Sequence, residues 1–178
     1  MSTAGPITVE DRVAIDDLFA RYAWAVDTGD VEAFVPLFTP DAVILDPNGR
    51  FDAETGGPAA FVELMRGNPT FPGRQHWVGQ LVLEGDTESI TARSFAIVPS
   101  LHRTGATNLH LVAWYEDELR KVDGRWLFAA RAIRPWAGDV LARFPGGAGG
   151  PPGSSRPGRP PGGCPRRGAR GRSGLTPG

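Results

Sequence analysis

The chain has 178 residues, 40% of them hydrophobic, so it can bury the core of one domain. Its formal net charge is −1, but the segment from Pro145 onward carries six arginines and no acid, and removing those six charges leaves −7 for the rest. An acidic body has little long-range attraction for nucleic acids or anionic lipids. We therefore expect small molecules or other proteins as partners.

Targeting and redox signals are absent from the sequence. The single cysteine, Cys164, excludes an intramolecular disulfide. The N-terminus lacks a basic start followed by an apolar run, and no stretch approaches the roughly 20 apolar residues of a membrane helix. The expectation is a cytoplasmic protein without membrane contact.

Helical periodicity marks the first part of the chain. Thr8 and Asp11 form a capping pair, and apolar residues then recur at helical spacing, namely Ile15, Leu18, Phe19, Tyr22 and Val26. Gly29 is a stop signal for this helix.

Two shorter helices and a hairpin are predicted next. Asp30 can cap a helix whose apolar residues are Phe34, Leu37 and Phe38, and Pro58 suits the first position of a third helix closed by Gly67. Between them, residues 41–46 read as a strand that ends in a turn at 47–49.

Strand patterns fill the rest of the body. Four β-rich segments cover residues 75–85, 88–101, 106–122 and 125–136, with turn signals between them. Helices first and a meander afterwards predict an α+β fold over residues 6–144, in which three helices cover a curved antiparallel sheet as a cone around an apolar pocket. The acidic run 115–118 is interpreted as the solvated face of an edge strand.

The segment 145–178 holds twelve glycines and eight prolines among its 34 residues. So little apolar surface cannot offset the chain entropy lost on folding, so the sequence predicts a disordered tail. It is either a dispensable extension, the interpretation we favour, or an arginine–glycine arm for RNA or acidic partners.

Asp27 and His76 are the leading candidates for chemistry. Asp27 falls in the last turn of the first helix, where the helix dipole disfavours a carboxylate unless a partner compensates. If His76 meets it, Asp27 would hold one imidazole tautomer and make His76 a competent base. Alternatively, Asp27 only begins a turn and His76 is a structural histidine at the sheet edge.

Further side chains are candidates for substrate binding. Tyr22 could complete the core or point its hydroxyl into the cavity, and core packing is the simpler interpretation. Most strand aromatics should be core, with Trp24 and Trp77 as candidate pocket walls. His110 alternates with leucines in a strand and could be a second polar group of the pocket, or structural.

The sequence contains no motif that is typical of metal or cofactor binding. The histidines at positions 76, 102 and 110 include neither His-x-His nor His-Glu-x-x-His spacing, and the body has no cysteine. No Gly-x-Ser-x-Gly elbow is present. We expect cofactor-independent chemistry without a metal.

The segments ARYAWAVDTGDVEAFVPLFTPDAVI, RQHWVGQLVLE and YEDELRKVDGRWLFAARAIRPW, in this order, resemble the SnoaL-like branch of the nuclear transport factor 2-like superfamily. The resemblance covers residues 6 to about 140. It implies the cone fold and assembly into a homodimer or homotrimer. It leaves the activity open, since that superfamily contains dehydratases, dehydrochlorinases, isomerases, polyketide cyclases and non-enzymes.

Residue by residue, the resemblance assigns Asp27 and His76 to the catalytic dyad of the dehydratase and dehydrochlorinase members. It also aligns Arg134, eight residues after Trp126, with an arginine that assists the departing group. The second pocket histidine of scytalone dehydratase has no counterpart in AIVPS, and the tyrosine before its dyad aspartate is Val26 here. These departures argue against scytalone itself as the substrate.

The sequence therefore predicts a cofactor-independent lyase or isomerase that uses Asp27 and His76 on a small apolar cyclic or polyketide-like substrate. The alternative is a non-catalytic module of the same fold that binds a ligand or assembles as a subunit.

Overall fold

The structure is a computed structural model that describes residues 5–69, 71–101, 105 and 107–136. The predicted tail at 145–178 lies outside the described residues. Among those that are described, no helix is both long and apolar enough to cross a membrane.

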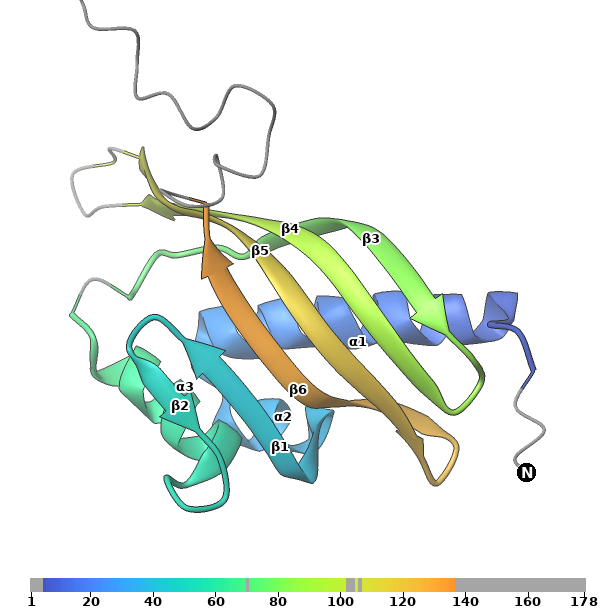
Figure 1. The fold of residues 1–178 in the computed structure, drawn as a ribbon. Helices are drawn as coiled ribbons and strands as arrows, with labels where there is room; N and C mark the ends of the chain where they lie inside the picture. The colour runs from blue at the N-terminus through green and yellow to red at the C-terminus, as the bar shows by residue number, and fades with distance from the viewer. Residues whose placement is uncertain (1–4, 70, 102–104, 106, 137–178) are drawn as a thin grey trace, which may run out of the picture. The chain divides into compact units, whose positions relative to one another are not determined.

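The first helix, α1, spans Val9–Thr28 and lies across one face of the sheet (Figure 1). Its start is a capping box, in which the Thr8 hydroxyl accepts the Asp11 N–H and the Asp11 carboxylate accepts the Thr8 N–H. Gly29 ends the helix in the left-handed conformation, with φ of 65°. The predicted start and stop are both confirmed.

The shorter helices follow the predicted order. Asp30 caps α2, Val31–Phe34, which continues as a 3-10 turn, Val35–Leu37, and α3 spans Gly57–Gly67. Phe38, which we predicted to be helical, instead begins a strand. It pairs with Phe128 of the last strand, so a tertiary contact overrides the local helical pattern.

Six strands form one mixed sheet in the order β2-β1-β6-β5-β4-β3. The strands are β1 Phe38–Asp46, β2 Gly49–Phe51, β3 Trp77–Gly85, β4 Ser89–Leu101, β5 Thr107–Val122 and β6 Arg125–Pro135. β1 runs parallel to β6, and every other neighbouring pair is antiparallel. The α+β class is confirmed, with three helices among the described residues, and the sheet is mixed because β1 pairs parallel with β6.

β5 corrects one interpretation. The run 115–118 does not lie on an edge strand, because β5 sits between β4 and β6. Alternation along the strand turns Tyr115 and Asp117 to the face that α1 covers, where they are 0% and 1% exposed. Within the run 115–118, Glu116 and Glu118 face away from α1.

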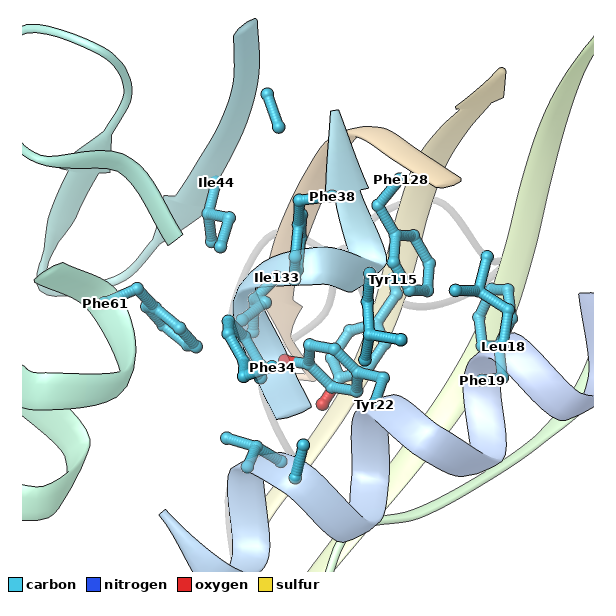
Figure 2. Close-up of a cluster of buried hydrophobic side chains, with 14 of the residues drawn as sticks. Leu18, Phe19, Tyr22, Phe34, Phe38, Ile44, Phe61, Tyr115, Phe128 and Ile133 are labelled. Carbon is cyan, nitrogen blue, oxygen red and sulfur yellow. The ribbon is translucent and has the colours of Figure 1, made fainter. Parts of the chain in front are cut away.

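Aromatic side chains fill the space between α1, α2 and the sheet (Figure 2). The Tyr22 ring lies 5.3 Å from Phe34 and 5.7 Å from Phe128, and Phe34 packs 4.9 Å from Phe38. Tilted and edge-to-face rings at such distances add to the free energy of burial. Within this packing Tyr22 is fully buried, as the core interpretation predicts.

Candidate functional site

Asp27 and His76 are in direct contact. Asp27 is in the last turn of α1, and His76 immediately precedes β3. The Asp27 Oδ1 and His76 Nδ1 atoms are 2.5 Å apart, and Asp27 Oδ2 accepts the His76 backbone N–H at 2.7 Å. The last turn of α1 has no basic residue, so these two hydrogen bonds supply the compensation that a carboxylate needs at a helix C-terminus.

This geometry determines the form of the imidazole. A carboxylate can only accept, so Nδ1 carries the proton and the neutral ring keeps its acceptor on Nε2. The Asp27 side chain is 18% exposed and the His76 side chain is 12% exposed, so the pair is largely shielded from competing water. An imidazole held in this way can take a proton from a neighbouring group.

His76 also lines a hollow of about 650 Å³ between α1 and the edge strand β3. The walls are mostly aromatic and aliphatic, and include Phe19, Trp24, Trp77, Phe95 and Ile97. The volume suits a small ligand. This hollow lies at the sheet edge, and buried side chains pack the described interior beneath α1.

The edge strand is irregular beside this hollow. Its pairing with β4 shifts between Gly79 and Val82, and Gln80 takes a positive φ of 54°. β-Bulges bend an edge strand and are frequent next to functional sites. Gly79 and Gln80 both line the hollow, so the irregular segment forms part of its wall.

The two tryptophans of the prediction lie on the surface. Trp24 is 75% and Trp77 is 67% exposed, and both line the hollow that contains His76. Their rings are placed to cover an apolar ligand, although such a role stays a prediction.

His110 lies in β5 at a second irregularity. Val98 pairs with Leu111 and Pro99 with Leu109, so His110 is the extra residue of a bulge. Desolvation of its ring, followed by the charges of Arg74 and His76, lowers the pKa of His110 below its usual value. His110 is exposed and is not among the residues that line the hollow containing His76.

Arg134 is not brought to the Asp27–His76 pair. It lies in β6 beside Trp114, on the sheet face away from α1, and its Nε donates to Glu116 at 3.2 Å. A role in receiving an anion would require this exposed ion pair to open.

Sequence reasoning missed a buried ion pair, Arg131 with Asp117. Arg131 donates from Nε and Nη2 to the two Asp117 oxygens at 2.7 and 2.9 Å, and both side chains are 0% exposed. Burial disfavours the charge of Arg131, but Asp117 outweighs that effect and holds its pKa above the usual value. The available signal was a lone arginine inside the apolar run FAARAI.

The part of the chain that the structure describes contains no candidate metal site. Nowhere in it do three histidine, cysteine or acidic side chains gather so that they could hold an ion.

The SnoaL-like domain family matches residues 8–132, which is well over half of the chain. The chain belongs to this family. The predicted resemblance is thereby confirmed. No curated protein matches the chain.

Solved structures agree on the fold of this SnoaL-like domain. An NTF2-like protein with a cystatin-like fold from Novosphingobium aromaticivorans is 26% identical, with a TM-score of 0.66 over 76% of this chain and 88% of that one. A putative scytalone dehydratase from the same organism is 22% identical, with a TM-score of 0.61 over 72% and 86%. The beta subunit of a putative aromatic-ring-hydroxylating dioxygenase, also from that organism, is 22% identical, with a TM-score of 0.58 over 69% and 87%.

Proposed function

We propose that this protein is a cofactor-independent lyase or isomerase that removes a proton from carbon in a small, mainly apolar, cyclic or polyketide-like substrate. His76 is the general base through Nε2, and Asp27 orients the ring and stabilises the imidazolium that forms. The observation that carries the proposal is the 2.5 Å contact of Asp27 with His76 at the wall of an apolar hollow.

Elimination is the version we favour, as dehydration or loss of halide. A positioned base contributes roughly 10²–10⁴-fold to rate, and apolar side chains such as Trp24 and Trp77 would contact an apolar substrate. A putative scytalone dehydratase shares this fold at 22% identity, and dehydration is one form of elimination. Assignment of the departing anion to Arg134 rests on the family resemblance.

The test uses cyclic β-hydroxyketones and halogenated cyclohexanes, with carbon–deuterium exchange in D₂O and product formation followed by NMR. His76→Gln removes the general base, and Asp27→Asn removes the carboxylate that stabilises the imidazolium, so each should lower the rate at least about 100-fold while the melting temperature stays within a few degrees. Asp17→Asn, on the exposed side of α1, is the matched control and should keep the wild-type rate.

Unchanged exchange and turnover in His76→Gln would refute the enzyme assignment. Binding of these compounds without exchange or turnover by the wild-type protein would favour the non-catalytic binding module.

We further propose that the protein forms a homo-oligomer through the sheet face that α1 leaves uncovered. Large apolar residues on this face are exposed, among them Trp77, Val82, Phe95, Ile97, Leu101 and Leu109. Exposed apolar patches of this kind are typical of protein interfaces. The similarity to a dioxygenase beta subunit is in line with assembly.

A further inference from the structure

The hollow that contains His76 continues onto the outer face of the sheet, the face turned away from α1. Figure 1 shows α1 behind the strands, so their near face is this outer face. In β4, Ala96 is fully buried beneath α1, whereas its neighbours Phe95 and Ile97 point to the outer face and are exposed. Both nevertheless line the hollow, together with Trp77, which lies opposite Ile97 in the β3–β4 ladder. The hollow therefore reaches around the edge strand β3.

Within one chain, the apolar walls of this hollow are open to water. Trp24 and Trp77 are exposed over most of their surface, although the Asp27–His76 pair beside them is largely shielded. Sites for small ligands usually bury most of the surface of the ligand. A cover over the tryptophans and over Phe95 would therefore complete a site whose base is already in place.

The apolar part of the outer face adjoins the hollow. Phe95 lies opposite Trp114 in the β4–β5 ladder, and the Trp136 ring packs 5.2 Å from Phe95 and 5.8 Å from Trp114. Leu101 and Leu109, farther along the same two strands, are 54% and 61% exposed. Contiguous apolar surface of this kind is typical of protein interfaces. A partner that packs on it also lies against the wall of the hollow.

The charges on the outer face suit a second copy of this chain. The acidic body, with a net charge of −7, would in general repel another copy. On the outer face, however, Glu84 accepts from Arg93 at 2.9 Å and Glu116 accepts from Arg134 at 3.2 Å. These pairs cancel within each copy, although Glu118 adds one acid to the face. Two such faces therefore repel each other far less than the net charge suggests, and a two-fold interface joins identical faces.

We propose that a second copy of this chain, docked on the outer face, covers the hollow beside His76 and completes the ligand site. This inference rests on the proposed function and names both a partner and a form of regulation for the same site. The ligand binds well only to the assembled protein. By linkage, a ligand held between the hollow and the partner strengthens assembly by the same factor.

The test measures binding of 2-naphthol, a small bicyclic molecule, by isothermal titration calorimetry, and the mass of the protein by multi-angle light scattering. Leu109→Arg places a charge in the apolar part of the outer face and changes no side chain that lines the hollow. This variant should consist of single chains that bind 2-naphthol about tenfold or more weakly than wild type. Leu101→Arg repeats the test at a second position of the same patch and should give the same result.

Two further variants complete the design. Leu64→Arg makes the same change at an exposed position of α3 and should keep both the oligomer and the affinity of wild type. Ala20→Phe shows where the probe binds, because Ala20 is exposed on α1 and lines the hollow. Its ring should occupy the hollow and weaken binding about tenfold while the oligomer persists. In wild type, 2-naphthol should reduce dissociation of the oligomer on dilution.

The possible failures of this inference and of the proposed function differ. Single chains of Leu109→Arg and Leu101→Arg with wild-type affinity for 2-naphthol would overturn the subunit cover, even if His76 proves to be the base. A monomeric wild type that binds 2-naphthol in the hollow would overturn it as well. Unchanged proton exchange in His76→Gln would instead refute the base and leave the cover standing, because binding of the probe requires no proton transfer.

Discussion

Asp11 is the side chain that ties the start of α1 to the sheet. Its Oδ1 atom accepts from Lys121 Nζ at 2.5 Å and from Trp126 Nε1 at 2.9 Å, and its Oδ2 accepts from the Thr8 hydroxyl. The hydrogen bond from Lys121 is the main reason that the pKa of Asp11 lies well below its usual value; burial opposes this, and Trp126 and Thr8 reinforce it. One carboxylate thus serves as helix cap and as tertiary contact.

Asp11→Asn should lower the free energy of unfolding by roughly 1.5–3 kcal/mol, because a buried carboxylate loses charge-assisted hydrogen bonds. Urea unfolding measures this. Asp16→Asn is the control, since Asp16 pairs with Arg12 on the exposed side of α1 and should cost at most about 0.5 kcal/mol.

The Asp11 contribution also has a defined pH dependence. The folded-state pKa is depressed below the unfolded value of about 3.9, so the stabilisation is complete above that value and is lost as the pH falls below it. Wild type should therefore lose more stability than Asp11→Asn between pH 6 and about pH 3. Parallel stability curves for the two proteins would contradict this role.

At the scale of elements, the β3–β4 hairpin shapes the wall of the hollow. β3 is an edge strand with a bulge, so its position depends on pairing with β4 and on the turn that joins them. Gly85 opens this turn with φ of 144°, a conformation that favours glycine, and an added Cβ would overlap the Ser89 carbonyl oxygen. The Ser89 carbonyl oxygen belongs to the backbone, so it cannot move aside as the end of a flexible side chain could.

Gly85→Ala should destabilise the protein by about 1–3 kcal/mol, since it combines backbone strain with a backbone clash. Gly67→Ala at the end of α3 is the matched control: an added Cβ there meets no atom within 4 Å, and the change should be neutral or stabilising by up to about 1 kcal/mol. Thermal and urea unfolding compare the two. Equal effects of both substitutions would show that the hairpin does not depend on Gly85.

At the scale of the whole molecule, the two faces of the sheet differ. One face carries α1 and the aromatic core, whereas the other exposes apolar side chains around Phe95, which packs 5.2 Å from Trp136. Phe95 and Ile97 also line the hollow that contains His76. A partner subunit on this face would therefore cover side chains next to the candidate site.

Phe95→Arg should convert an oligomer into single chains, because a charge at the centre of an apolar interface is costly to bury. Multi-angle light scattering should give two or three chains of 19.0 kDa for wild type and one for the variant. Val13→Arg, at an exposed site on α1, should leave the oligomer intact. A monomeric wild type at high concentration would contradict the proposal.

Local patterns in the sequence determined the elements, because caps, turns and hydrophobic period act within a few residues. The structure confirms the predicted helix start at Thr8 and Asp11, the helix end at Gly29 and the break between the β-rich segments 106–122 and 125–136. The fold class follows from the order of these elements, and the family resemblance pointed to Asp27 and His76 as neighbours across 49 positions.

Only the tertiary structure decided which side chains are buried and what they meet. Strand order made β5 central, which buried Asp117 against Arg131, and it left Arg134 with Glu116 on the opposite face. The same order placed Trp24 and Trp77 on the surface beside His76. Burial depends on which distant segments cover a residue, and that information is absent from local spacing.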